Sequence, residues 1–405
     1  MNWIPAKLGD LLTLEYGKSL PRSSRDESGA VPVAGSNGSD GNHSVALVKG
    51  PGIVVGRKGS AGKVTWFDAG FWPIDTTYFV EHDPKVTDLR WLYYLLQSMA
   101  LTRLNKTTGV PGLNRNDAYA ESCWLPPLSE QQKIVELLDE AERLRKLRRD
   151  ADAKADRILP VLFLKMFGDP VINPKKWSLI CIGDLAKLVT SGSTPRGGSE
   201  VYVCEGPYII RSQNVLMNRL RLSDAARITD EMHQQMSRTW VSIGDVLLNI
   251  TGASIGRVAW VKELDAPANV NQHVCIIRPD SNLINSAFLS ACLSLPSMQA
   301  TIDGVQTGAS RQALNHVQVR NLRIPAPPVT LQSKFALHAN VIEGMLEQGD
   351  SANRKLDSLW DTLMTRAFSG QLTAKWREGH MKELLAEMGQ QARMLNLPAQ
   401  LETTP

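Results

Sequence analysis

The chain has 405 residues, of which 43% are hydrophobic and 21% are charged, and its formal net charge is +4. This composition excludes a largely disordered chain, and the length allows two or three domains. The weak positive charge permits a polyanionic partner without requiring one. We also expect a cytoplasmic protein, because no stretch approaches the roughly 18 apolar residues of a membrane span and the start, MNWIPAKLGDLL, lacks a signal core.

The five cysteines stand far apart, and the two nearest, Cys275 and Cys292, are 17 positions from each other. This spacing fits neither a zinc-binding C-x-x-C pair nor a disulfide framework. The histidines are few and form no H-x-x-x-H pattern, so we expect no metal site.

Residues 1–128 alternate short apolar runs such as GIVVG with turns rich in Gly, Pro, Ser and Asn, and they include helical patches such as LRWLYYLLQS. This pattern predicts an α+β domain. Within it, VVGRKGSAGKVTW resembles a phosphate-binding loop, G-x-x-x-x-G-K-[ST], but that motif requires Gly where the chain has Arg57 and a hydroxyl where it has Val64. The loop is therefore not a nucleotide site.

Residues 129–168 predict a long helix that opens at PPLSEQQ, with Ser129 as the N-cap and Gln132 completing a capping box. Pro160 should kink or break this helix near its end. Apolar residues at heptad spacing predict a coiled-coil seam. They are Ile134, Leu137, Ala141, Leu144, Ala151, Ala155, Ile158 and Leu162.

The second half of the chain repeats these landmarks in order. VLLNITGASIGRVAW corresponds to VVGRKGSAGKVTW, and QTGASRQALN corresponds to TTGVPGLN. Pro126-Pro127 and Gln131 recur at Pro327-Pro328 and Gln332. Such ordered recurrence indicates a duplication. It predicts a second α+β domain at 169–328, a second helix at 329–371 and a tail at 372–405 with a short helix, ELLAEMGQQARML. The second seam comprises Phe335, Ile342, Met345, Ala352, Leu356, Leu359 and Leu363.

Two long helices of equal register in one chain predict an antiparallel intramolecular coiled coil, because each helix starts where its own domain ends. At 1.5 Å per residue, roughly 35 to 40 residues span about 55 to 60 Å. We therefore expect an α+β fold of two similar domains separated by this helix pair and related by a pseudo-twofold axis.

These residues resemble the DNA-specificity subunit of Type I restriction-modification enzymes over nearly the whole chain. The resemblance rests on VPVAGSNG, VVGRKGSAGKV, TTGVPGLN, LPPLSEQQKIVELLDEAERL and MFGDP, and on YIIRSQNV, NITGASIGRV, TGASRQALN, IPAPPVTLQSKF and LMTRAFSGQL in the second copy. The second helix departs from the family, because it opens with Leu331-Gln332-Ser333 in place of Glu-Gln-Gln.

The resemblance implies a non-catalytic subunit that reads a bipartite double-stranded DNA sequence, one half-site per domain. It also implies two methyltransferase subunits and motor-nuclease subunits as partners. S-adenosylmethionine would then belong to the methyltransferases, ATP and Mg to the motors, and no cofactor to this chain.

Three other functions are an enzyme with fused methylation activity, a structural scaffold and a free-standing DNA-binding protein. The chain lacks N-P-P-[FY], D-P-P-Y, G-x-G cofactor and Walker motifs, which argues against an enzyme with fused methylation activity. A purely structural coiled-coil scaffold would leave the repeated polar glycine loops unexplained. A free-standing two-domain DNA-binding protein without enzyme partners remains an alternative.

Candidate DNA contacts lie in the repeated loops, where Arg can read guanine and Asn or Gln can read adenine. The alternatives are solvated turns and turn-capping side chains. The candidates are Arg57, Lys58, Lys63 and Arg257 beside glycines, Asn114, Arg115, Arg311, Gln312 and Asn315 in the TTGVPGLN-type loops, and Ser36, Asn37, Arg211, Gln213 and Asn214 after apolar strands.

Two further basic groups call for other roles. Lys106 and Arg103 suit backbone phosphates, which orient a complex without specifying a sequence. The run RLRKLRR at 143–149 is surrounded by acidic residues, which is typical of a solvated helix face with internal ion pairs.

Overall fold

The computed structural model describes residues 3–105, 112–194, 197–305 and 313–397. The chain divides into two units, residues 1–148 with 352–405 and residues 149–351. Both units mix helices with mainly antiparallel sheets, which confirms the predicted α+β class. We call them unit 1 and unit 2.

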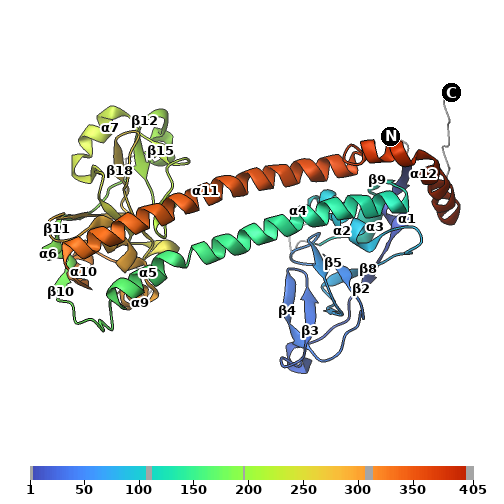
Figure 1. Ribbon diagram of the computed structural model, residues 1–405, viewed down its shortest axis with the longest axis horizontal. Coiled ribbons are helices and arrows are strands. Elements are labelled where there is room, and N and C mark those ends of the chain that lie inside the picture. Colours follow the sequence, from blue (N-terminus) through green and yellow to red (C-terminus); the bar gives the residue numbers. More distant parts are fainter. Residues whose placement is uncertain (1–2, 106–111, 195–196, 306–312, 398–405) are drawn as a thin grey trace. The chain divides into compact units, whose positions relative to one another are not determined.

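Unit 1 is built on a four-stranded antiparallel sheet of order β2-β8-β5-β6 (Figure 1). Its strands are β2 (Thr13–Tyr16), β8 (Thr77–Glu81), β5 (Gly52–Gly56) and β6 (Val64–Phe67). All residues of the central strand β5 are buried, so this run of GIVVG forms part of the core. The smaller sheets have orders β4-β3-β7 and β1-β9.

The remaining elements of unit 1 surround this sheet. The smaller strands are β1 (Ile4–Lys7), β3 (Val31–Gly35), β4 (Gly38–His43), β7 (Trp72–Pro73) and β9 (Ser122–Leu125), and the short helices are α1 (Leu8–Leu11), α2 (Leu89–Ser98) and α3 (Arg115–Tyr119). Helix α2 contributes buried aromatic rings, with Trp91 and Tyr94 fully enclosed.

Unit 2 repeats the same strand order, β11-β19-β16-β17, with smaller sheets β15-β12-β18 and β10-β20. This agreement confirms the duplication inferred from the sequence. The strands are β10 (Leu179–Cys181), β11 (Ala186–Ser191), β12 (Val203–Ile210), β15 (Ala226–Arg227), β16 (Val246–Asn249), β17 (Val258–Trp260), β18 (Ala268–Val270), β19 (Val274–Pro279) and β20 (Arg323–Pro325).

Unit 2 also carries elements that unit 1 lacks at the corresponding point. Between β12 and β16 lie the hairpin β13 (Val215–Leu216) and β14 (Arg219–Leu220) and the helix α7 (Asp230–Gln235). This insertion makes the second copy longer than the first. The other short helices are α6 (Ile182–Leu185), α8 (Ser286–Ser294), α9 (Pro296–Gly304) and α10 (His316–Asn321).

The first long helix is interrupted and the second is continuous. The first consists of two helices, α4 (Leu128–Ala155) and α5 (Ile158–Phe167), whereas the second is the single helix α11 (Val329–Phe368) (Figure 1). Pro160 lies in the first turn of α5, where a missing N–H is tolerated because that group has no intrahelical acceptor. The predicted break near Pro160 is confirmed.

The helices pair antiparallel within unit 1. Near the start of α4, Ile134 shares a core with Ala367 near the end of α11. Further along α4, Arg145 pairs with Asp357 at 2.6 Å. The partner number falls as the α4 number rises, which confirms the predicted antiparallel direction.

Unit 2 contains the complementary helix ends. Phe163 and Phe167 of α5 lie 5.5 and 5.6 Å from the ring of Phe335 near the start of α11, and both contact Phe288 of α8. Each unit therefore combines the domain and helix start of one copy with the helix end of the other copy.

The predicted heptad seam is only partly correct. Leu144, Leu359 and Met345 are 46%, 52% and 62% exposed, so these seam positions face solvent. Next to Leu144, Arg145 takes the inward position, and its guanidinium carbon lies 4.9 Å from the ring centroid of Trp360. The physical reason is that an α-helix of 3.6 residues per turn drifts away from a strict 3.5-residue repeat.

The predicted capping of α4 is wrong. The helix begins at Leu128, so Ser129 lies within its first turn. The Ser129 N–H and hydroxyl both donate to the Glu387 carboxylate, at 3.0 and 2.9 Å. Glu387 belongs to α12 (Ala374–Leu395), which is longer than the short helix predicted for the tail. A carboxylate at the N-terminus of a helix is favoured by the helix dipole.

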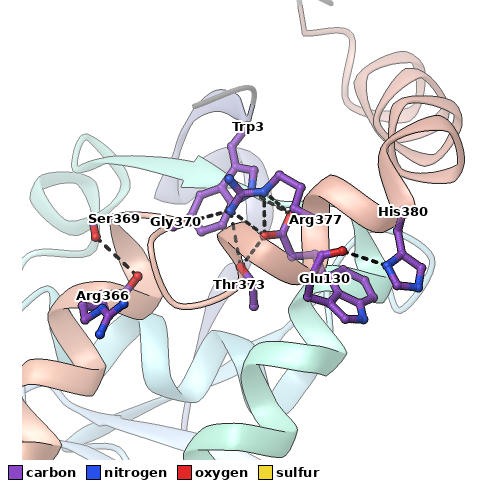
Figure 2. A network of polar contacts seen from close by, with 9 residues as sticks. Trp3, Glu130, Arg366, Ser369, Gly370, Thr373, Arg377 and His380 are labelled. Atoms are coloured by element: carbon purple, nitrogen blue, oxygen red, sulfur yellow. Dashed lines mark hydrogen bonds and ion pairs between the residues drawn. The ribbon is translucent and has the colours of Figure 1, made fainter.

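A buried carboxylate anchors α12 within unit 1. Figure 2 shows Arg377 and Thr373 converging on Glu130, with the ring of Trp3 beside the guanidinium. The Glu130 side chain is fully buried and accepts hydrogen bonds from Trp3 Nε1 at 2.9 Å, Thr373 Oγ1 at 2.5 Å and Arg377 Nη2 at 2.7 Å. We call this group the Glu130 network.

The Glu130 network explains the departure at the start of the second helix. Gln131 and Gln332 are equivalent, so Leu331 occupies the position of Glu130. In unit 2, Trp177, the counterpart of Trp3, donates instead to the Phe167 carbonyl oxygen at 3.0 Å. A buried carboxylate requires a charged partner such as Arg377, whereas the apolar side chain of Leu331 requires none.

Equivalent glutamines join each long helix to its domain. Gln131 Nε2 donates to the carbonyls of Val86 and Pro126, and its Oε1 accepts from the N–H of Asp88 at 2.7 Å. Gln332 makes the same three bonds in unit 2, with Leu283, Pro327 and Asn285. We call each set a glutamine hook.

The described residues contain no helix with the length and apolarity needed to cross a bilayer. They also contain no group of three or more His, Cys, Asp or Glu placed to hold a metal ion. All five cysteines are free thiols.

Candidate nucleic-acid interface

The repeated loops meet at one edge of each four-stranded sheet. In unit 1, Tyr16 at the end of β2 pairs with Tyr78 at the start of β8, and Val55 at the end of β5 pairs with Tyr78 and with Val64 at the start of β6. In unit 2 the same positions are Ser191, Cys275, Leu248 and Val258. We call these the loop edges of the two units.

Glycines shape the turn that follows β5. Gly59 and Gly62 have φ values of +75° and +81°, and a Cβ at Gly62 would lie 2.5 Å from the Thr102 backbone nitrogen. Gly252 and Gly256 in unit 2 have φ values of +74° and +86°. Since only glycine adopts this backbone readily, the shared glycines make a tight turn.

This turn brings two predicted residues of unit 1 together. Lys63 Nζ donates to the carbonyl and the side-chain oxygen of Asn37, at 2.8 and 2.7 Å. Ser36 lies beside the same turn, because its hydroxyl would contact a Cβ at Gly59 at 3.6 Å. Lys58 is exposed in this turn. The turn therefore joins the VPVAGSNG and VVGRKGSAGKV motifs, which are distant in sequence.

Arg57 and Arg115 converge on one exposed ring. Their guanidinium carbons lie 5.3 and 5.1 Å from the centroid of Tyr16, which is 47% exposed. Tyr16 also lies 5.1 Å from Tyr78. Burial, followed by the neighbouring Tyr16, raises the pKa of Tyr78 to about 12, so this phenol stays neutral at physiological pH. Sequence reasoning missed Tyr16, although it directly precedes the repeated Gly17-Lys18 landmark.

Asn114 and Asn315 hold equivalent structural positions. The Asn114 side chain caps α3 by accepting from the Asn116 N–H, and Asn315 caps α10 by accepting from the Gln318 N–H. Both asparagines are exposed, and their side-chain amide groups remain at the loop edges. Capping uses one of the two lone pairs of each side-chain oxygen, so the amide donor group and one lone pair are left for another partner.

The predicted residues of unit 2 divide into accessible and buried groups. Arg211 lies 5.5 Å from the ring of Tyr202, while Gln213 and Arg257 are exposed. Asn214 is fully buried, accepts from the Arg211 N–H at 3.0 Å and donates to Asp224 at 3.3 Å. As a correction to the sequence analysis, Asn214 caps a turn in this structure and is withdrawn as a DNA contact.

Several other predicted residues have different outcomes. Lys106, Arg311 and Gln312 lie outside the described residues. Arg103 forms an ion pair with Glu121. On α4, Arg143 pairs with Glu140 at 2.7 Å and Arg145 with Asp357, in agreement with a helix face that uses internal ion pairs.

Unit 2 also presents polar residues at its loop edge that the sequence analysis did not select. The Thr251 hydroxyl and His273 Nδ1 are 2.5 Å apart, and Gln272 Nε2 lies 3.4 Å from His273 Nε2. His273 directly precedes β19, so its position is equivalent to that of Thr76 before β8. Recognising Gln272 and His273 required the strand register, since both lie outside the repeated motifs, whereas Thr251 lies within VLLNITGASIGRVAW.

The fold and its two loop edges define a protein built from two copies of one α+β domain, each presenting polar turns at the same end of its sheet. The sequence family described as Type I restriction modification DNA specificity domain matches residues 1–153 and 174–336, so the chain belongs to this family and contains the domain twice.

Similar proteins agree with this assignment. The chain is 24% identical over 364 residues to the Type I restriction enzyme EcoBI specificity subunit of Escherichia coli, covering 80% of this chain and 74% of that one. It is 20% identical over 310 residues to the MjaVIII specificity subunit of Methanocaldococcus jannaschii, covering 73% of both chains. The chain is thus a Type I specificity subunit, the DNA-recognition and non-catalytic component of a complex.

A solved structure supports the fold. The S subunit of a Type I restriction-modification system from M. genitalium has a TM-score of 0.60 and 16% identity to this chain, covering 91% of this chain and 96% of that one. At this identity the similarity concerns the fold alone.

Proposed function

We propose that this subunit reads a bipartite target in double-stranded DNA, with residues 1–128 reading one half-site and residues 169–328 reading the other. The observation that carries this proposal is the pair of loop edges. Both copies place equivalent turns at the same end of the same sheet, yet the side chains at matching positions differ. Two domains with one backbone and two sets of side chains suit two different half-sites.

The chemistry of the loop edges supports contact with DNA. In unit 1, Arg57, Lys58, Lys63 and Arg115 gather there, and in unit 2, Arg211 and Arg257 lie in equivalent loops. Arginine and lysine bind phosphates and guanine, while asparagine and glutamine suit adenine. Tight glycine turns hold Lys58, Lys63 and Arg257 in place, which lowers the entropy lost on binding.

We further propose that the partners are two methyltransferase subunits and motor-nuclease subunits. The support is family membership, because the similar proteins are named specificity subunits of Type I restriction enzymes. In this proposal S-adenosylmethionine is bound by the methyltransferase subunits, and ATP and Mg by the motor subunits.

The test is a genome-wide map of N6-methyladenine in the native host, with and without this gene. We expect deletion to abolish methylation at one motif made of two short half-sites around a fixed unspecific gap. Restoring the gene should restore that motif alone. An unchanged map in a host that expresses the system would contradict the proposal and favour a free-standing DNA-binding protein.

A second measurement separates a DNA reader from a structural scaffold. Binding of the full chain to duplex DNA should weaken steeply with salt, because each neutralised phosphate releases a counterion. A flat salt dependence would favour the scaffold.

A further inference from the structure

We infer that Tyr16, Arg57 and Arg115 form a guanine-reading cluster in the first recognition domain, in which Tyr16 positions the two guanidinium groups. This inference rests on the proposed function and assigns a base chemistry to one loop edge. We call the three residues the Tyr16 cluster.

Two guanidinium groups lie close together in the Tyr16 cluster. Among the described residues neither Arg57 nor Arg115 forms an ion pair, although both lie within 5.3 Å of the same ring centroid. Arg57 Nε is buried without a hydrogen-bond partner, and Arg115 has a single long contact, 3.5 Å from its Nη1 to the Leu14 carbonyl oxygen. Two uncompensated guanidinium groups at one site call for a partner rich in acceptor atoms.

The Tyr16 ring also orients the two arginine side chains. An arginine on an aromatic ring is held by cation–π attraction, so its planar fork of donors is presented with fewer free rotations. Tyr16 is itself held against Tyr78 and is fixed at the end of β2 by pairing with β8. A positioned fork can form two parallel hydrogen bonds, either to the O6 and N7 acceptors of guanine or to two oxygens of a phosphate.

The second copy has different residues at all three positions of the Tyr16 cluster. The strand register makes Ser191 equivalent to Tyr16, and the paired hydrogen bonds Leu113 N–H to Arg57 and Leu314 N–H to Ile250 make Ile250 equivalent to Arg57. The helix caps make His316 equivalent to Arg115. A phosphate site would serve both half-sites and would be expected twice. The Tyr16 cluster occurs once, which points to sequence reading.

The experiment uses the full chain purified with its methyltransferase subunits and duplexes carrying the mapped bipartite motif. Each duplex carries one base-pair change in one half-site. Arg57→Lys and Arg115→Lys keep the charge but lose the bidentate fork. We expect each to reduce discrimination at one G·C pair of a single half-site by roughly tenfold or more, with little change in binding to scrambled DNA.

Further variants make the result decisive. Tyr16→Phe should keep discrimination and Tyr16→Ser should reduce it, because the ring and not the hydroxyl holds the guanidinium groups. Lys85→Ala is the matched control, since Lys85 is exposed and follows the opposite end of β8. Melting temperatures should be similar for all variants that keep the charge.

Three results would overturn the inference. Full discrimination at every base pair in both Lys variants would exclude base reading. An equal loss of affinity on cognate and scrambled DNA in Arg57→Ala and Arg115→Ala would assign the arginines to phosphates. A change at both half-sites would exclude a role limited to the first domain. If the wild-type complex has no bipartite motif, the proposed function itself fails, and this outcome is distinct from the other three.

Discussion

The two copies share their backbone plan, and two of the places where they differ are the loop edge and the start of the long helix. The sheet order, the glycine turns and the glutamine hooks occur in both. The Glu130 network and the Tyr16 cluster occur in the first copy alone among the described residues. The duplication preserved the groups that hold each domain together, while the contacts to other segments and the side chains at the loop edge diverged.

The start of the long helix shows this divergence most directly. In unit 1 a buried carboxylate at Glu130 is stabilised by Arg377 from α12, and in unit 2 the same position is Leu331. A buried charge requires a partner, so the identity of this residue follows the presence of α12.

The largest expected effect comes from Glu130→Leu, which gives the first copy the residue of the second. The substitution leaves Arg377 without its carboxylate beside Trp3, and removal of one partner of a buried pair costs about 3–5 kcal/mol. Urea unfolding should show a less stable unit 1, and hydrogen exchange should show faster exchange in α12.

Two variants act as controls for this prediction. Glu130→Leu combined with Arg377→Met should recover part of the loss, because no buried charge is left unpaired. Glu140→Leu removes an exposed partner of Arg143 and should not change stability measurably. If Glu130→Leu alone were neutral, the Glu130 network would not stabilise α12.

An intermediate effect is expected from the glutamine hooks. Gln332→Leu leaves the Asn285 N–H and the Pro327 carbonyl without their partner, and such buried groups cost about 1–3 kcal/mol. Gln131→Leu should cost less, because Gln391 of α12 also donates to the carbonyls of Val86 and Pro126, at 2.8 and 3.3 Å.

The measurement for the hooks is urea unfolding of the single variants Gln131→Leu, Gln332→Leu and Gln391→Leu, and of Gln131→Leu combined with Gln391→Leu. We expect this double variant to lose more stability than the sum of Gln131→Leu and Gln391→Leu, since the shared carbonyls then have no donor from either side chain. Equal losses for Gln131→Leu and Gln332→Leu would show that Gln391 offers no compensation.

The smallest effect tests the corrected helix seam. Leu144→Gln should change the unfolding free energy by less than about 0.5 kcal/mol, because this side chain is largely exposed. Leu138→Ala, at a fully buried position of the same helix, should cost about 2–5 kcal/mol. A large loss for Leu144→Gln would restore the original heptad assignment.

The sequence by itself determined the duplication, the α+β class, the break near Pro160 and the antiparallel helix direction. These features depend on local signals that recur, such as Gly59 and Gly62 with their counterparts, or on chain connectivity. Each signal has a direct physical cause, since a left-handed turn needs glycine and a proline cannot continue a helix.

Only the tertiary structure decided which side chains meet. Tyr16 lies about 40 residues from Arg57 and about 100 from Arg115, yet the strand register and the α3 cap bring all three together. Glu130 meets Arg377 because α12 folds back onto the start of α4. The sequence alone does not distinguish Asn214 and Leu144 from the neighbouring candidate residues. Whether each side chain is buried or exposed depends on which face of its turn or helix points inward. Such contacts between distant residues leave no periodic signal in a single chain, so they become visible only in the folded molecule.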